Sequence, residues 1–294
     1  LATVSEVTPH VRNERTIAAR NDALRRFHEI ATDDARPVDD RIDAVLELGS
    51  EHLGTDMGVF FRVGEDACTV ERAHAPNETI RPGDEFALDE TFCEAVVDTG
   101  DLVVVSDAGM DEAMSGSART ARDVDAYIGA PVVVGGERYG TITFSQAAPR
   151  SRPFSEGERT FVCILGQWIG KELSRRENER RATENWARLR QIIDLLPQFV
   201  FVKDEYNEYL LANEALAEAY GTTVDDVEGS TDADFVKSDA EAEAFRRDDL
   251  AVIDSGGPTE IPAETLTVAS GETLTLRTVK IPYDPVGRDA EAAL

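Results

Sequence analysis

Apolar residues recur at helical spacing in the first part of the chain. Within residues 14–32 they fall three or four positions apart, which predicts an amphipathic helix with Ile17, Leu24, Phe27 and Ile30 on one face. Pro37 begins a second helical pattern, and Gly54 ends it. The segments that follow, MGVFFRV at 57–63 and ACTVERAHA at 67–75, are typical of two strands joined by a turn. Two helices and a β-hairpin are therefore expected.

Shorter elements are expected in the segment that follows the hairpin. A short helix ends at Gly100, and LVVVSD at 102–107 predicts a buried strand. Residues 109–123 are small and polar, which predicts a mobile loop. Residues 127–146 contain two apolar stretches joined by Gly135–Gly136, which indicates a hairpin turn.

A long helix is expected over residues 155–196. Ser155 and Glu158 have capping-box spacing at its start. From its second turn onward a heptad seam is apolar at both ends and charged in the middle. The seam comprises Phe161, Leu165, Trp168, Glu172, Arg175, Glu179, Ala182, Trp186, Leu189, Ile193 and Leu196. At 1.5 Å per residue, about 40 residues span roughly 60 Å.

Two interpretations of this helix stay open. The first is a charged linker helix on the surface. The second is a parallel coiled coil that joins two domains of the chain and holds two chains together through residues 161–196. The apolar seam resumes in register at Trp186, which favours the coiled coil.

The last hundred residues predict a second unit of strands and helices. FVFVKD at 199–204 and YLLAN at 209–213 are strand-like, and the short helix that follows them ends at Gly221. A helical pattern within residues 238–256 precedes two alternating strands that turn at Ser270–Gly271.

The charge balance is strongly acidic, with 58 acidic and 30 basic residues, a net charge of −28 and a pI of about 4.4. Only four of the basic residues are lysines. The acids are spread evenly among apolar residues, which argues against disorder and indicates a hydrated surface adapted to high salt. We therefore expect a halophilic source. Nucleic acid is not an expected partner, because the sequence has no basic patch for phosphate contacts.

No catalytic, metal or membrane motif stands out in the sequence. The cysteines, Cys68, Cys93 and Cys163, have no metal-ligand spacing, which favours a reduced, cytoplasmic compartment and no bound metal. No apolar run approaches the roughly 18 residues of a membrane span. His28 precedes a glutamate, but no ATP-binding motif follows, so we do not expect a phospho-acceptor there. The chain begins at Leu1 and is expected to be a piece of a longer protein.

Residues 20–175 resemble a GAF domain, through the order and spacing of TFCEAVVDTG, LVVVSDA, YIGAPVVV, ERYGTITF and PFSEGE. Residues 186–294 resemble a PAS domain, mainly through LLPQFVFVKDEYNEYLLANEALAEAYGTT and GSTDADF. The resemblance implies an α+β fold in which two antiparallel-sheet sensory domains, GAF-like then PAS-like, are joined by the long helix. Residues 1–19 are then an N-terminal linker or helix start. A PAS sheet has five strands and only four are expected here, so we expect the last strand to be missing.

The resemblance also implies small-molecule pockets between sheet and helices. In the GAF-like domain the expected pocket residues are Phe60, Thr91, Phe92, Cys93, Tyr127 and Phe144. In the PAS-like domain they are Phe201, Lys203, Asn213, Tyr220, Phe235 and Lys280. Aromatic residues at such positions belong to the core more often than to a ligand site, and the sequence indicates no particular cofactor.

Lys203 and Lys280 raise a specific question in a chain with so few lysines. Lys203 ends the first PAS-like strand beside Asp204, where a lysine–aspartate pair is usually exposed and worth under about 1 kcal/mol. Alternatively, the two lysines lie on one sheet and offer a cationic point to an anionic ligand. Asn213, after the second strand, is expected to cap the following helix.

Cys93 lies near a helix start, where a thiolate is favoured, although packing in the core is the simpler interpretation. A GAF-like and PAS-like tandem on a charged helix is similar to the sensory region of haloarchaeal sensor histidine kinases. We therefore expect a homodimeric, cytoplasmic sensor of a small molecule or a redox signal, with a downstream kinase or other output domain. Two alternatives stay open: a bacterio-opsin-activator-like transcription regulator, and a redox enzyme built on the GAF-like domain.

Overall fold

The computed structural model describes residues 8–76, 80–108, 124–236, 238–284 and 292–293, of which 8–16 and 292–293 are described by their backbone. The chain divides into two compact units, residues 1–179 and 180–294. The loop predicted at 109–123 lies outside the described residues.

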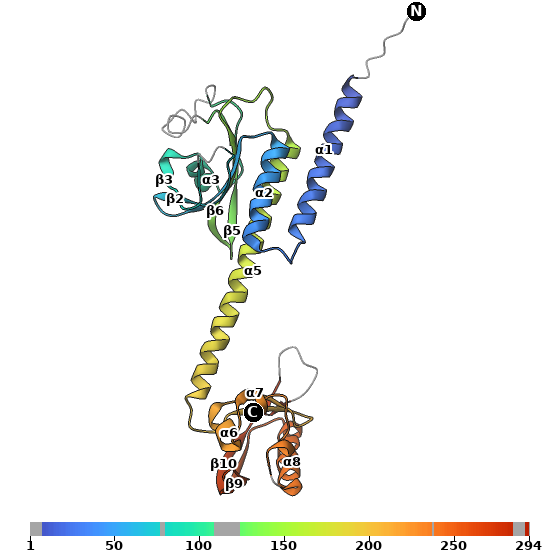
Figure 1. Cartoon of the computed structure of the whole chain (residues 1–294), viewed down its shortest axis with the longest axis vertical. Helices are drawn as coiled ribbons and strands as arrows, with labels where there is room; N and C mark the ends of the chain where they lie inside the picture. The colour runs from blue at the N-terminus through green and yellow to red at the C-terminus, as the bar shows by residue number, and fades with distance from the viewer. Residues whose placement is uncertain (1–7, 77–79, 109–123, 237, 285–291, 294) are drawn as a thin grey trace, which may run out of the picture. The chain divides into compact units, whose positions relative to one another are not determined.

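A six-stranded antiparallel sheet forms the centre of the first unit, in the order β3-β2-β1-β6-β5-β4 (Figure 1). Its strands are β1 Met57–Val63, β2 Ala67–His74, β3 Glu85–Ala87, β4 Val103–Val105, β5 Ala126–Val134 and β6 Glu137–Gln146. The turn between β5 and β6 consists of Gly135 and Gly136, both with positive φ (61° and 89°), a conformation that glycine adopts without strain. The predicted hairpin is confirmed.

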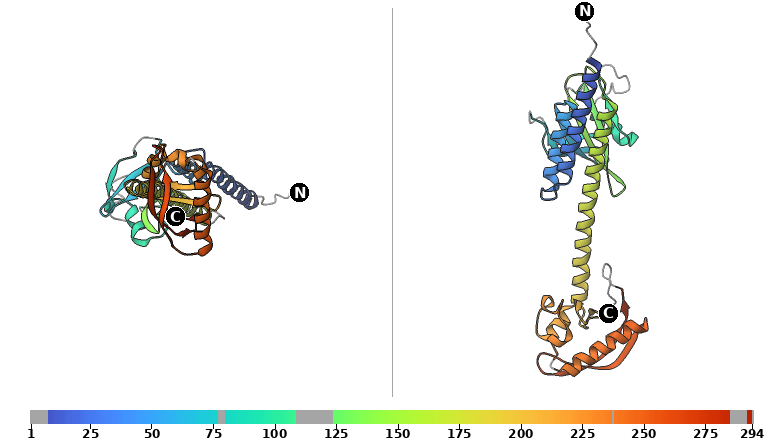
Figure 2. Two further views of the ribbon diagram at one scale, coloured as in Figure 1. Left: turned by 90° about the horizontal axis from the view of Figure 1, so that it is seen from below. Right: turned by 90° about the vertical axis from the view of Figure 1, so that its right-hand side faces the viewer.

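Helices cover both faces of this sheet (Figures 1 and 2). α2 Val38–Leu53 and the first half of α5 Glu156–Asp194 pack on one face, and α1 Thr8–Ala31 packs on the outer side of these two helices. The short η1 Leu88–Glu90 and α3 Cys93–Thr99 lie on the other face. The main core lies under the three longer helices, with Ile42, Leu46, Ile128, Ile142, Leu165 and Ile169 among its fully buried side chains. Pro37 and Gly54 flank α2 as its N-cap and C-cap residues, as expected.

The start of α5 has the capping box that the sequence predicts. Ser155 donates to the Glu158 carboxylate through its backbone nitrogen at 2.7 Å and through its hydroxyl at 2.6 Å. The backbone nitrogen of Glu158 donates back to the Ser155 hydroxyl at 3.3 Å. Arg150 and Arg152 also donate to this carboxylate, so the helix start is fixed by four residues.

The first part of the heptad seam belongs to the core of its own unit, which corrects the expectation that residues 161–196 all serve a dimer. Phe161 and Leu165 are fully buried against α2 and the sheet. Glu172, further along the seam, forms an ion pair with the buried Arg41 at 2.5 Å. The first three turns of the seam therefore have partners within the chain, and the coiled coil and the dimer stay predictions.

The second unit contains short strands and helices around a smaller core (Figure 1). The strands are β7 Phe201–Asp204, β8 Tyr209–Ala212, β9 Thr259–Thr267, β10 Thr273–Lys280, β11 Pro282–Tyr283 and β12 Ala292–Ala293. The helices are α6 Glu214–Tyr220, α7 Val224–Val227, η3 Asp232–Asp234 and α8 Asp239–Ser255. All strand pairs are antiparallel, in the orders β11-β12-β7-β8 and β10-β9. The predicted α+β fold with two antiparallel-sheet units is confirmed. The described residues of this unit form six strands where the sequence predicted four, because β11 and β12 are only two residues long and show no alternating pattern. The missing last strand stays a prediction.

Candidate ligand site

Lys203 lies inside the second unit rather than on its surface. The side chain is 2% exposed, and its Nζ lies 2.6 Å from Asp232 Oδ2 and 2.8 Å from Asp249 Oδ2. Asp204, the sequence neighbour, accepts hydrogen bonds from the backbone nitrogens of Tyr206 and Glu208 at the β7–β8 turn. The interpretation of Lys203 and Asp204 as an exposed ion pair is therefore wrong, because the partners of Lys203 come from η3 and α8.

Lys280 extends the same cluster from β10. Its Nζ donates to Asp249 Oδ1 at 2.6 Å and pairs with Glu264 Oε1 at 3.1 Å, while the side chain is 1% exposed. Burial alone would lower the pKa of Lys280, but the Asp249 and Glu264 carboxylates raise this pKa above its ordinary value. Lys280 therefore stays charged, and Asp249 is shared between two ammonium groups.

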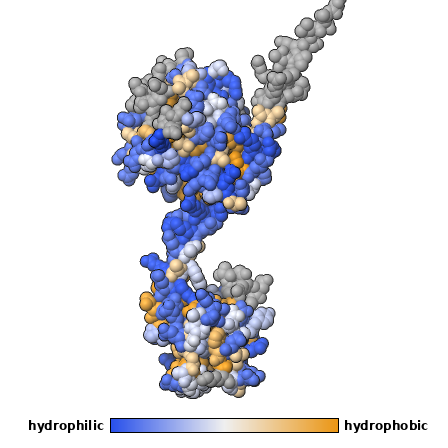
Figure 3. Space-filling view, viewed as in Figure 1, coloured by the Kyte–Doolittle hydropathy of each residue, from blue (hydrophilic) through white to orange (hydrophobic). Residues whose placement is uncertain are grey.

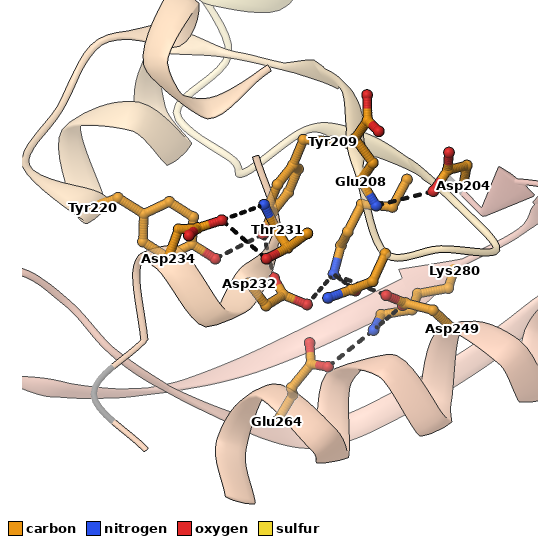
Figure 4. A network of polar contacts seen from close by, with 12 residues as sticks. Asp204, Glu208, Tyr209, Tyr220, Thr231, Asp232, Asp234, Asp249, Glu264 and Lys280 are labelled. Carbon is orange, nitrogen blue, oxygen red and sulfur yellow. Dashed lines mark hydrogen bonds and ion pairs between the residues drawn. The ribbon is translucent and has the colours of Figure 1, made fainter. Parts of the chain in front are cut away.

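Two tyrosines continue the network on the other side of Asp232 (Figure 4). The Tyr209 hydroxyl donates to Asp232 Oδ1 at 2.6 Å and lies 2.8 Å from the Tyr220 hydroxyl. Burial, together with the nearby carboxylate, raises the pKa of both phenols well above the ordinary value. They stay neutral, and the network runs without a break from Tyr220 to Glu264.

A cavity of about 600 Å³ lies beside this network. Its charged lining residues are Lys203, Asp232, Glu264, Arg277 and Lys280, and its aromatic ones are Phe199, Phe201, Tyr209, Tyr220 and Phe245. Of the six residues expected for this pocket, four line the cavity: Phe201, Lys203, Tyr220 and Lys280. We call this cavity, with its lining, the chamber.

Asn213 and Phe235, the other two expected residues, have structural contacts instead. Asn213 caps α6 by accepting from the backbone nitrogen of Leu216 at 3.3 Å, so the capping prediction is confirmed. Its amide nitrogen donates to the carbonyls of Ile193, Leu196 and Gln198, which joins the end of α5 to α6. Phe235 stacks on the Tyr220 ring with 4.9 Å between centroids and thus supports the chamber wall from behind.

The six residues expected for a pocket in the first unit do not gather at one place. Phe60 and Phe144 lie in the core under α2 and α5, whereas Phe92, Cys93 and Tyr127 lie in the clusters on the α3 face. Thr91 is beside Cys93, with its hydroxyl 3.9 Å from the Cys68 sulfur. The sheet separates the two sets, so the expectation of one pocket containing all six is wrong.

Cys93 is a buried thiol in contact with hydroxyl groups. It is 2% exposed, and the Thr141 hydroxyl donates to its sulfur at 3.2 Å. The neighbouring Cys68 thiol and burial raise the pKa of Cys93 well above its ordinary value. The fold thus brings Cys68 and Cys93 together, which their spacing did not indicate, but it keeps Cys93 protonated and a poor nucleophile.

In the described part of the chain, His, Cys, Asp and Glu side chains do not gather in threes that could bind a metal ion. Asp232 and Asp234, an acidic pair in the sequence, separate in the fold: Asp232 faces Lys203, and Asp234 caps η3 through Thr231. Among the described helices, none is long and apolar enough to cross a membrane.

The chain consists of two antiparallel-sheet units with flanking helices, and the second unit contains the chamber. A family model of the GAF domain matches residues 37–173, and one of the PAS fold matches residues 193–294. The chain therefore contains a GAF domain followed by a PAS-fold domain. No curated protein matches the chain.

Solved structures resemble the first unit. A GAF domain from a phosphoenolpyruvate-protein phosphotransferase of Coxiella burnetii is 17% identical, covering 55% of this chain and 98% of that chain, with a TM-score of 0.47. The corresponding Acinetobacter domain is 17% identical, covering 56% and 97%, with a TM-score of 0.44. The free methionine-R-sulfoxide reductase of Neisseria meningitidis, in complex with its substrate, is 14% identical, covering 60% and 97%, with a TM-score of 0.44. Similarity at this level carries neither a ligand nor an activity over to this chain.

Proposed function

We propose that the chain is the ligand-sensing region of a cytoplasmic signal-transduction protein from a halophile, with a two-component histidine kinase as its output. The observation that carries this proposal is the chamber of the PAS-fold domain, where buried polar groups and aromatic rings meet at one cavity. The order GAF, charged helix, PAS fold supports the signalling part, and the scarcity of lysine on an acidic surface supports the halophilic source. Cysteines without disulfide spacing support a reducing compartment.

The chemistry of the first unit argues against a redox enzyme. A thiol nucleophile needs a lowered pKa and access to solvent, and Cys93 has a raised pKa and is buried. The GAF domain is therefore proposed as a regulatory domain rather than a sulfoxide reductase.

A homodimer contact on α5 is the second part of the proposal. Trp186 and Leu189 are each 57% exposed, at seam positions in the half of the helix beyond the GAF core. Leu196, the last seam position, is 40% exposed and follows the end of α5 at Asp194. Large apolar side chains at heptad positions on an exposed helix face fit a second copy of the same helix. Between them and the GAF core, the helix surface is hydrophilic (Figure 3) and contains Arg175–Glu179 and Arg180–Glu184 ion pairs.

Native mass spectrometry at high protein concentration, after purification in high salt, tests both parts together. The expected spectrum is a dimer with additional mass, and the same sample denatured should release that mass. An empty dimer would argue against tight ligand binding, and an empty monomer would refute both parts.

Matched variants separate the dimer from the ligand. Leu189→Glu places a charge in the seam and should give monomers. Leu195→Glu, at a position that is 83% exposed and outside the seam, should leave the dimer unchanged. Equal behaviour of the two variants would contradict the α5 contact.

A further inference from the structure

The two lysines on the chamber wall already have partners of opposite charge. Lys203 Nζ lies within 2.8 Å of two carboxylates, those of Asp232 and Asp249. Lys280 Nζ lies within 3.1 Å of two carboxylates, those of Asp249 and Glu264. Both lysine side chains are buried, so an anion could reach them only by displacing a buried carboxylate, which is costly. The expectation that the lysines offer a free cationic point to an anionic ligand is therefore not supported.

The third cation of the lining, Arg277, is also paired. Its side chain is 72% exposed, and its Nε donates to Glu260 at 2.6 Å. A charged ligand group in the chamber would therefore lose its water shell and find each charged lining residue that the structure describes already paired. An ion without a counter-charge is strongly disfavoured in surroundings of low polarity. A neutral ligand avoids this cost.

Most of the remaining chamber wall is apolar or aromatic. Its lining includes Phe199, Phe201, Leu216, Phe245, Leu266 and Leu276. Such side chains favour a ligand with an apolar or aromatic body, because both surfaces are removed from water on binding.

The two tyrosine hydroxyls indicate which polar group the ligand should have (Figure 4). A phenol has one hydrogen to donate, and Tyr209 donates its hydrogen to Asp232 Oδ1 at 2.6 Å. In the 2.8 Å contact between the phenols, the donor is therefore Tyr220. The Tyr220 oxygen has no other hydrogen-bond partner among the described residues, and Tyr220 lines the chamber. This oxygen can accept a hydrogen bond from a ligand.

We infer that the chamber binds a neutral, mostly apolar molecule with one N–H or O–H donor directed at the Tyr220 oxygen. This inference rests on the proposed ligand-binding function and adds the charge class and the polar group of the ligand. The apolar wall contacts the body of the molecule, and the hydrogen bond to Tyr220 orients it. The ring of Tyr220 is itself held by the stacked Phe235.

Three probes of similar size test the charge class on the intact chain: 2-phenylethanol, 2-phenylethylamine and phenylacetate. At pH 7 the alcohol is neutral, the amine is a cation and the acid is an anion. Binding is measured by calorimetry in 1 M NaCl, where a Debye length of about 3 Å suppresses general effects of the acidic surface. The alcohol should bind at least about tenfold more tightly than either ion.

Indole and benzofuran test the hydrogen bond, because they have the same shape and only indole has an N–H donor. Indole should bind about fivefold more tightly to the parent chain. Tyr220→Phe removes the acceptor and keeps the ring, so it should abolish this preference and leave the affinity for benzofuran unchanged. Tyr206→Phe is the matched control at a position that is 68% exposed, and should change neither affinity.

The outcomes distinguish this inference from the proposed function. Tighter binding of either ion than of the alcohol, or equal binding of the three, would overturn the neutral class while a ligand-binding chamber stands. Equal binding of indole and benzofuran, or a preference for indole that persists in Tyr220→Phe, would overturn the hydrogen bond to Tyr220. Binding of none of the probes would contradict both the inference and the proposed function. Both comparisons on the parent chain need no variant, so they decide the inference even if Tyr220→Phe does not fold.

Discussion

Replacement of Lys203 by Met removes the charge at the centre of the buried network. Met is similar in size, so the change in packing is small. The carboxylates of Asp232 and Asp249 lie 2.6 and 2.8 Å from the lost ammonium, at a site that is 2% exposed. Asp249 then keeps only Lys280 as a counter-charge, and Asp232 loses its ion pair with Lys203. Removal of one partner from a buried ion pair costs about 3–5 kcal/mol. This is a large part of the roughly 5–15 kcal/mol that stabilises a domain.

The assay must report on the second unit alone. Urea unfolding at pH 7, followed by hydrogen-exchange mass spectrometry of peptides from β7 and β8, gives the free energy of unfolding of that unit. Lys171→Met is the matched control, because Lys171 is exposed on α5 and its replacement should change stability by less than about 0.5 kcal/mol. Adding Asp232→Asn to Lys203→Met should restore part of the loss, since it removes one uncompensated charge and keeps the acceptor for Tyr209.

A loss below about 1 kcal/mol for Lys203→Met would refute this reasoning, because that is the value of an exposed pair. A full loss that Asp232→Asn fails to reduce would show that packing rather than charge is responsible.

Three further predictions concern other residues. Burial alone would raise the pKa of Glu158, but hydrogen bonds from Ser155 and from Arg152 lower this pKa, so the stabilisation from Glu158 is present above about pH 4.5 and is lost as pH falls through the lowered pKa. Glu158→Gln should therefore cost about 2 kcal/mol at pH 7 and little at pH 3, measured by urea unfolding. Cys163 is half-buried and should react first with a thiol reagent, whereas Cys93 should react only after unfolding. Early labelling of Cys93 would contradict its protonated, buried state. Asn213→Ala should lower the free energy of unfolding by about 2–4 kcal/mol, because buried backbone groups lose their hydrogen-bond partners. The control Ser238→Ala, at an N-cap without a side-chain hydrogen bond, should leave the free energy of unfolding unchanged in the same assay.

Much of the fold could be predicted because its signals are local. Helical periodicity, the Gly135–Gly136 turn and the Ser155–Glu158 capping box each depend on a few neighbouring residues, and the structure confirms them. The Asn213 cap was predictable for the same reason, since an asparagine between a strand and a helix has a side-chain oxygen within reach of the first turn.

The assignment of side chains to faces failed where both faces of a strand are buried. Phe60 and Phe61 are adjacent in β1, and Phe60 faces the helix core while Phe61 lies in the cluster with Cys68. Alternation of apolar and polar residues identifies the inner face only if the other face is polar. The sequence of β1 therefore could not indicate which phenylalanine lies on the α3 side.

The partners of the lysines could not be predicted for a different reason. Lys203 and Lys280 stand out because lysine is rare here, but Asp232, Asp249 and Glu264 are three of 58 acidic residues and have no distinguishing pattern. Tyr209 was missed as well, since a tyrosine on a short strand is unremarkable until its hydroxyl is seen beside a buried carboxylate. The scarcity of lysine thus identifies the positive groups of the network, and only the fold identifies the carboxylates that pair with them.

The sharing of groups within this network gives the PAS-fold domain a physical basis for a response. Asp249 pairs with both lysines, and each lysine pairs with two carboxylates, so no single bond changes without altering the balance of its neighbours. A change that draws Glu264 away from Lys280 would leave Lys280 more dependent on Asp249 and, through Asp249, would weaken the contact between α8 and Lys203 in β7. The ion pairs connect Glu264 in β9 to Lys203 in β7, and energetic coupling between these positions is measurable. A double-mutant cycle of Glu264→Gln with Tyr209→Phe should give an interaction energy of about 0.5 kcal/mol or more if the chain of bonds acts as a unit, and near zero if its two ends are independent.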